Sequence, residues 1–310
     1  MKKESIKRKG GVLMPISALP SDCGIGTLGQ GAYDFVDWLE SAGMTIWQVL
    51  PLLPTGYGDS PYQSCSSNAV NPYFIDFDLL VKDGLLEKSD YQDMTWQDDE
   101  RRVDYGKQFS QKREVLKKAF YNFDKTTADW QAFLTEGKYA DYALFMALKA
   151  KFCYVPWMEW PKAYAEGDEA TLDAFKTEHK EEIEFWQFTQ YLFLRQWKAL
   201  LAYAHAKGVS IMGDMPIYLS EDSSSDLLHT SFPTKTTKKT RRRRSSKLAT
   251  KALPNLPCAQ SSLRKSMLPM CVKANLYAVT VAPATSNSLG LTTTTSATSA
   301  RLWVISVTSV

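Results

Sequence analysis

Short apolar runs and a helical period alternate along the first fifty residues. Residues 11–16 are apolar and precede a loop rich in glycine, serine and proline that extends to residue 31, which predicts a strand followed by its loop. A helix is predicted next, with a stop at Gly43, because apolar residues recur at helical spacing: Tyr33, Phe35, Val36, Leu39 and Met44. Residues 45–50 then resemble a buried strand that ends at Pro51. Strand, helix and strand in this order predict a βαβ unit with a parallel sheet.

A long loop follows the second predicted strand. It extends from Pro54 to Pro72 and is rich in glycine, serine, asparagine and proline. A loop of this length inside a globular chain is usually functional. In a (β/α)8 barrel, active sites are built at the carboxyl ends of the strands, where this loop begins.

The pattern from residue 79 to residue 208 is mostly helical. The clearest helix covers residues 181–207, is ended by Gly208, and has apolar positions three and four residues apart: Tyr191, Leu194, Trp197, Leu201 and Ala204. Residues 209–214 predict a third strand with Asp214 at its carboxyl end. The expected fold class is α/β, a partial (β/α)8 TIM barrel containing the first three strands, with a large helical insertion.

The composition changes abruptly after Asp226. All 34 acidic residues lie at or before Asp226, whereas 13 of the 37 basic residues follow it, so the front part carries 24 − 34 = −10 and the remainder +13. Serine and threonine make up 26 of the last 84 residues. With so little apolar surface available to offset chain entropy, we expect a disordered basic tail.

These patterns divide the chain into four parts. Residues 10–80 hold barrel strands 1 and 2 with the loop, residues 81–205 a helical insertion, residues 206–226 barrel strand 3, and residues 227–310 the basic tail.

Cysteine usage and hydropathy favour a cytoplasmic protein. The five cysteines are an odd number without CxxC spacing, which indicates neither a disulfide framework nor a zinc site. The apolar run after the basic amino terminus is too short for a secretion signal. No stretch approaches the roughly 18 apolar residues that span a bilayer, so no membrane association is expected.

The loop after the second strand carries residue types suited to sugars. Carbohydrate sites combine flat aromatic rings with directional hydrogen-bonding groups. The loop offers rings and polar groups in turn: Tyr57, Asp59, Ser60, Tyr62 and Gln63. Composition alone favours the simpler alternative, in which the tyrosines only cover the barrel mouth.

Three runs of sequence sharpen this interpretation. Leu50-Pro51-Leu52-Leu53-Pro54-Thr55-Gly56-Tyr57-Gly58-Asp59-Ser60-Pro61-Tyr62-Gln63-Ser64, Gly213-Asp214-Met215-Pro216-Ile217-Tyr218 and Gly24-Ile25-Gly26-Thr27-Leu28-Gly29 closely resemble runs of the 4-α-glucanotransferases, the amylomaltase branch of the α-amylase clan. Their order and spacing also agree, and the resemblance covers about residues 10–226.

The resemblance implies a (β/α)8 barrel that transfers α-1,4-glucan segments between maltodextrins by a retaining mechanism, without a cofactor. It implies that Asp59, Ser60 and Tyr62 line the donor side of the sugar cleft. Asp214 and Tyr218 would lie near the reacting ring, although Asp214 could instead only order the strand end. Trp157 and Trp160 could form a sugar platform, but a core position is the simpler interpretation.

The catalytic carboxyl groups of such an enzyme are missing from this sequence. Retaining transfer needs a carboxylate nucleophile and a carboxylic acid about 5 Å apart. The family's Arg-x-Asp-His and Glu-Asp-Leu-Gly runs are absent, and Arg102-Val103-Asp104 is rejected as a nucleophile because Tyr105 follows it and it precedes strand 3. No Asp or Glu follows Asp226. We therefore assign no catalytic residue and expect the chain to be inactive alone.

The abrupt change near Ser225 suggests a reading-frame change in the gene. Translation of the other two frames tests this hypothesis, since it should recover the Arg-x-Asp-His and Glu-Asp-Leu-Gly runs.

Two other functions remain open. The chain could be a non-catalytic glucan-binding fragment. A nucleic-acid-binding protein that uses Lys238, Lys239 and the arginines at 241–244 against phosphates ranks last, because the basic run lacks interleaved aromatic residues and a recognised fold.

Overall fold

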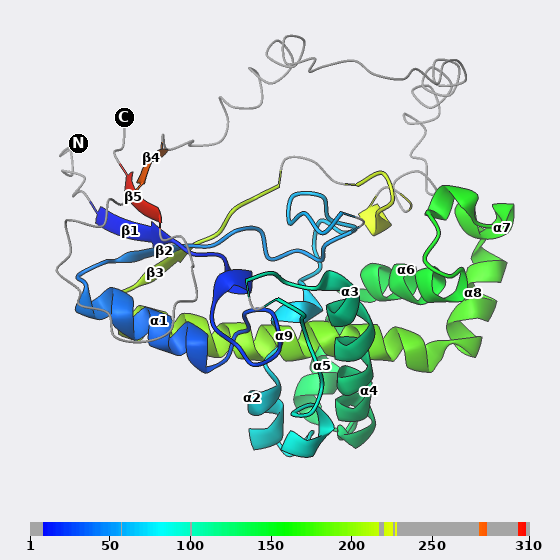
Figure 1. Cartoon of the computed structure of the whole chain (residues 1–310). Coiled ribbons are helices and arrows are strands. Elements are labelled where there is room, and N and C mark those ends of the chain that lie inside the picture. The colour runs from blue at the N-terminus through cyan, green and yellow to red at the C-terminus, as the bar shows by residue number, and fades with distance from the viewer. Residues whose placement is uncertain are drawn as a thin grey trace, which may run out of the picture.

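A computed structural model describes residues 9–56, 58–99, 101–216, 220–225 and 227, together with the backbone of residues 279–283 and 303–307 (Figure 1). A sheet lies at one end of the structure, at the left of Figure 1, with α1 and α9 beneath it and the other helices to its right.

Three parallel strands form the part of the sheet that the sequence predicted. β1 (Lys9–Leu13) pairs with β2 (Ile46–Gln48), and β2 pairs with β3 (Ser210–Met212). Trp47 lies between Val12 and Ile211 in the shared register, and the side chains of Trp47 and Val12 are fully buried. The predicted parallel βαβ unit is confirmed, and so is the α/β class. Each strand is shorter than its apolar run because the flanking residues leave the ladder to form loops.

Two helices cover one face of these strands. α1 (Gln30–Ser41) and α9 (Lys180–Ala206) run side by side beneath the sheet (Figure 1). Phe35 of α1 packs edge-on against Trp47 with ring centroids 5.0 Å apart. Gly43 follows α1 with a φ of 69°, a left-handed conformation that favours glycine and ends the helix as predicted.

The remaining helices lie between β2 and β3 in the chain. They are α2 (Phe77–Lys82), α3 (Tyr105–Lys107), the π-helical turn η4 (Gln108–Lys112), α4 (Arg113–Asn122), α5 (Ala128–Glu136), α6 (Ala140–Lys151), α7 (Lys162–Ala165) and α8 (Glu169–Glu178). Short 3-10 turns lie among them: η2 (Pro72–Phe74), η3 (Lys88–Asp90) and η5 (Trp157–Glu159). A further 3-10 turn, η1 (Ile16–Ala18), lies between β1 and α1.

Aromatic side chains fill the core of the helical region. Phe120 of α4, Trp130 of α5 and Phe188 of α9 are all buried, and the rings of Phe120 and Trp130 both pack against the ring of Phe188. Trp157 and Trp160 also belong to the core, with exposed fractions of 7% and 4%. The interpretation of these two tryptophans as core residues is confirmed.

The tail departs from its expected disorder in two places. β4 (Val279–Pro283) and β5 (Trp303–Val307) form an antiparallel pair, and β5 also pairs antiparallel with β1, giving the strand order β3-β2-β1-β5-β4. Their valine, isoleucine and tryptophan residues suit strands, and the open edge of β1 provides unpaired backbone groups. The expectation of a wholly disordered tail is therefore wrong for these segments. Apart from Leu227, the other tail residues lie outside the described part.

Candidate functional site

The loop after β2 folds back on itself. Thr55 and Ser64 form an isolated antiparallel bridge, and the Gly56 amide donates to the Gln63 carbonyl at 3.3 Å. Between them, Gly58 and Asp59 have φ values of 92° and 56°, so the chain turns through the left-handed region at the tip. We call the described residues between 55 and 65 the lobe. It carries four of the predicted site residues: Asp59, Ser60, Tyr62 and Gln63.

The lobe contacts the end of β3 through a short hydrogen bond. The Tyr62 hydroxyl donates to Oδ2 of Asp214 at 2.6 Å, while 44% of the Tyr62 surface remains exposed. Partial burial and the Asp214 carboxylate raise the pKa of Tyr62 to about 12, so its phenol stays protonated and acts as a donor at neutral pH. The structure therefore brings together two predicted site residues that are 152 positions apart.

The other predicted residues of the lobe are polar groups near this bond. Ser60 Oγ accepts from the Tyr62 amide at 3.3 Å. Partial loss of water around its carboxyl group raises the pKa of Asp59. Gln63 is exposed. Tyr57 and Tyr218 lie outside the described residues, so their predicted places in the site stay predictions.

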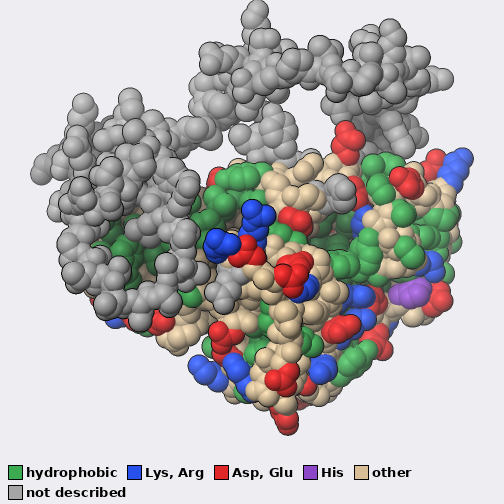
Figure 2. Space-filling view, viewed as in Figure 1, with side chains coloured by type: hydrophobic (Ala, Val, Ile, Leu, Met, Phe, Trp, Pro, Cys, Tyr) green, Lys and Arg blue, Asp and Glu red, His purple; other side chains and the backbone are tan. Residues whose placement is uncertain are grey.

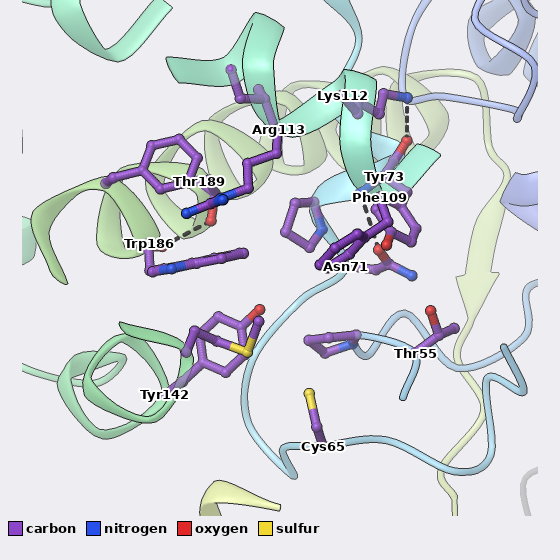
Figure 3. Close-up of a pocket in the computed structure, with 15 residues that line it drawn as sticks. Thr55, Cys65, Asn71, Tyr73, Phe109, Lys112, Arg113, Tyr142, Trp186 and Thr189 are labelled. Carbon is purple, nitrogen blue, oxygen red and sulfur yellow. Dashed lines mark hydrogen bonds between the residues drawn. The ribbon is translucent and has the colours of Figure 1, made fainter. Parts of the chain in front are cut away.

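A pocket of about 70 Å³ lies behind the lobe, between it and helices α4, α6 and α9. Figure 3 shows Trp186, Tyr142 and Phe109 around the pocket, with Cys65 and Thr55 on the lobe side. The guanidinium of Arg113 lies 6.0 Å from the centre of the Trp186 ring. The pocket wall is mostly apolar, and five of its 15 lining residues are aromatic.

One wall of this pocket contains a buried ammonium. Nζ of Lys112 donates to the Tyr73 carbonyl at 2.5 Å, and the residue is 1% exposed (Figure 3). Burial lowers the pKa of Lys112 to about 8, because the negative charges of Cys23 and Asp76 offset the loss of water only in part.

Comparison with known proteins identifies the family. The family model for 4-alpha-glucanotransferase matches residues 14–232. The chain belongs to this family. A 4-alpha-glucanotransferase of Clostridium butyricum is 46% identical over 214 residues, and one of Thermus thermophilus is 42% identical over 231 residues. These alignments cover 68% and 72% of this chain but 44% and 45% of the relatives, so the chain spans less than half the length of either.

A solved structure shares the fold. The amylomaltase from Streptococcus agalactiae, determined in complex with acarbose, is 44% identical with a TM-score of 0.68. The match covers 71% of this chain and 45% of that protein. The resemblance that the three sequence runs indicated is confirmed.

Two glutamines of this chain hold the segment that follows the lobe, and sequence analysis missed them. The Gln190 amide accepts from the Val70 amide at 2.7 Å and donates to the Val70 carbonyl at 3.0 Å. Gln196 forms the same paired contact with Asp76, at 2.8 and 2.9 Å. Both glutamines are buried in α9. Two amide side chains on the mostly apolar buried side of a helix indicate a buried polar contact. The sequence pattern does not show which residues they contact.

The rejected nucleophile candidate has a structural role in this family member. Asp104 precedes α3 and its carboxylate accepts a hydrogen bond from the Lys107 amide at 3.0 Å, which caps the helix. Within the described residues, no group of His, Cys, Asp and Glu is arranged to hold a metal ion, and no helix is long and apolar enough to cross a membrane.

Proposed function

We propose that this chain is the sugar-holding, amino-terminal part of a 4-α-glucanotransferase and that it binds α-1,4-glucans between the lobe and the end of β3. The hydrogen bond between Tyr62 and Asp214 supports this proposal most directly, because it joins two polar residues from separate strand ends at an accessible surface. The acarbose complex of the Streptococcus agalactiae relative adds support, since acarbose is bound there by a protein 44% identical to this one.

The proposed roles follow the geometry of the two loops. On the donor side, Asp59, Ser60 and Gln63 hydrogen-bond sugar hydroxyls, and Tyr57 and Tyr62 offer ring faces for sugar rings. Asp214 and Tyr218 lie near the reacting ring. The Tyr62 phenol fixes the Asp214 carboxylate in one orientation, which lowers the entropy lost when a sugar binds.

The proposed architecture is the first three strands of a (β/α)8 barrel. Parallel order and register of β1, β2 and β3 support it, as does the position of the lobe at the carboxyl end of β2. We assign residues 10–80 and 206–226 to the barrel, residues 81–205 to the helical insertion and residues 227–310 to the tail. The cytoplasm is the proposed compartment, because buried Cys23 and Cys65 and exposed Cys153 are free thiols.

The family reaction requires groups that this chain does not offer. A retaining double displacement needs a nucleophile and an acid about 5 Å apart, and the sequence has no Asp or Glu after Asp226. The chain therefore contributes substrate binding rather than bond cleavage.

Calorimetric titration with acarbose tests the proposal. We expect binding by the full chain and at least about fivefold weaker binding by Tyr62→Phe, which keeps the ring but loses the bond to Asp214. Tyr121→Phe is the matched control, because Tyr121 is also exposed, at 65%, but lies on α4. Absence of acarbose binding by the unmodified chain would overturn the proposal.

A nucleic-acid function has no comparable support among the described residues. Figure 2 shows acidic and basic side chains interspersed over the helical part of this face, without a uniform basic surface. The basic run at 238–244 lies outside the described part.

A further inference from the structure

The chain adopts an unusual backbone conformation just after α6. Cys153 and Tyr154 have φ values of 51° and 62°, so two consecutive residues with β-carbons occupy the left-handed region. Glycine normally occupies such positions, and other residues remain there only when their surroundings hold them. A specific interaction should therefore fix this turn.

Lys149 provides that interaction. Its Nζ donates to the Tyr154 carbonyl at 2.9 Å, to the Val155 carbonyl at 2.8 Å and to Oδ2 of Asp222 at 2.6 Å. An ammonium has three hydrogens, and all three are used. The Lys149 side chain is 9% exposed, so these acceptors replace water around the charge. The left-handed turn directs two carbonyls at the ammonium.

Asp222 extends this contact to the segment that follows β3. Its Oδ1 accepts from the Trp157 amide at 3.1 Å, and the Trp157 indole donates to the Glu221 carbonyl at 2.8 Å. We call Lys149, Tyr154, Val155, Trp157 and Asp222 the Lys149 junction. It fastens residues 221 and 222 to the helical region.

The other side of the same segment is bonded to the lobe. The Ser220 amide donates to the Ser64 carbonyl at 3.1 Å, and the Ser224 amide donates to the Cys65 carbonyl at 2.8 Å. Ser64 follows Tyr62 by two residues, and Asp222 follows Asp214 by eight. Asp214 is thus close in the chain to Asp222, which belongs to the Lys149 junction. Tyr62 is close in the chain to Ser64 and Cys65, which are bonded to the residues on either side of Asp222.

We propose that Lys149 is a positioning residue for glucan binding, which acts through Asp222 to hold Asp214 opposite Tyr62. Lys149 does not touch the sugar. It fixes the segment after β3 against the helical region, and that segment in turn fixes the lobe. The inference rests on the proposed glucan-binding function and adds a residue to it that no sugar-contact pattern would identify.

The chemistry of the junction defines the informative variants. Lys149→Met keeps the length of the side chain but leaves the Asp222 carboxylate and two turn carbonyls without their donor, so the turn can relax. Asp222→Asn keeps the shape and an oxygen acceptor but removes the opposite charge. Lys198→Met is the matched control, because Lys198 is an exposed lysine of α9.

Acarbose titration of the full chain and these variants tests the inference. We expect about tenfold weaker binding for Lys149→Met, about threefold weaker binding for Asp222→Asn, and unchanged binding for Lys198→Met. Near-ultraviolet circular dichroism at the titration temperature shows whether each variant is folded. If Lys149→Met does not fold, Asp222→Asn decides the question.

A double-mutant cycle separates positioning from general stabilisation. If Lys149 acts by placing Asp214, then Lys149→Met should add little to the loss already caused by Asp214→Asn. Folded Lys149→Met and Asp222→Asn proteins with normal affinity, or fully additive losses in the cycle, would overturn the positioning role while leaving glucan binding intact. Failure of the unmodified chain to bind acarbose would instead overturn the proposed function and this inference with it.

Discussion

At the residue scale, the buried ammonium of Lys112 makes the stability of the protein depend on pH. Its folded pKa is about 8, whereas the ordinary value is 10.5. Between these values the unfolded chain binds more protons than the folded protein, so this group makes folding more favourable as the pH rises. The gain attributable to Lys112 should be about 2 kcal/mol between pH 7 and pH 9.5.

The comparison of wild type with Lys112→Met measures this effect together with the electrostatic interaction between Lys112 and the Cys23 thiol. Burial raises the pKa of the Cys23 thiol, and it raises the pKa of Cys65 to about 12, so both thiols oppose the gain above pH 9 in either protein. Urea unfolding from pH 7 to pH 9.5 measures the free energy of unfolding of each. We expect the difference, wild type minus variant, to increase with pH. A difference that stays constant would show that Lys112 is charged in the folded state throughout.

At the scale of elements, α9 does more than cover the sheet, because its side chains also bind backbone groups of the segment that follows the lobe. Replacing Gln196 by leucine keeps the volume but leaves the amide and carbonyl of Asp76 without partners. Unpaired buried backbone groups should lower the free energy of unfolding by about 2–4 kcal/mol.

Gln187→Leu provides the control for this prediction. Gln187 is a half-buried residue of the same helix whose side chain makes no hydrogen bond among the described residues. Urea unfolding should show a large loss for Gln196→Leu and a change within about 0.5 kcal/mol for Gln187→Leu. Equal losses for the two variants would mean that helix substitution itself, rather than the Asp76 contact, lowers stability.

Elements with a strong apolar period could be predicted from the sequence, whereas contacts between elements could not. The spacing that ends at Gly208 predicts α9 to within a residue at each end, because the periodic side chains are the ones that pack. The three predicted strands agree with β1, β2 and β3 in direction but not in length, and β4 and β5 were not predicted. Ladder hydrogen bonds depend on the neighbouring strand, which the sequence of one strand does not describe.

In the candidate site, too, individual residues could be predicted from the sequence, but the contacts between them could not. Tyr62 and Asp214 were both singled out by their positions and by resemblance, yet their mutual bond depends on how two distant loops fold. Lys149 and Asp222 carry no local signature, since a lysine in a helix is ordinarily solvent-exposed and its partner is 73 residues away. Only the structure brings them together.

At the scale of the whole molecule, the sheet combines two kinds of strand pairing. β1, β2 and β3 pair in parallel, whereas β5 pairs antiparallel with both β1 and β4. β5 pairs with β1 on one side, and β3 is the outermost strand on the other. Parallel sheets usually have both faces covered. Leu13, Gln48 and Met212, which share one register, are only half-buried. The proposed glucan-binding surface therefore lies beside a part of the sheet that the described residues cover incompletely.

We expect that the chain binds glucans but does not catalyse their disproportionation. In a maltotriose assay, disproportionation would release glucose and longer maltodextrins. We expect neither product from the full chain. Its sequence lacks the Arg-x-Asp-His and Glu-Asp-Leu-Gly runs that are expected to supply the nucleophile and the acid. The 4-alpha-glucanotransferase of Clostridium butyricum, assayed in parallel, is the positive control.

The outcome also distinguishes an inactive binding fragment from an enzyme with an unrecognised centre. Acarbose binding without maltotriose turnover fits the proposed sugar-holding role. If glucose appears, the carboxylates of the lobe and of β3 become the first candidates, and Asp59→Asn and Asp214→Asn should each be assayed. Complete loss of turnover in both variants would then place the reaction between the lobe and β3 and show that the catalytic groups assigned as missing are not required.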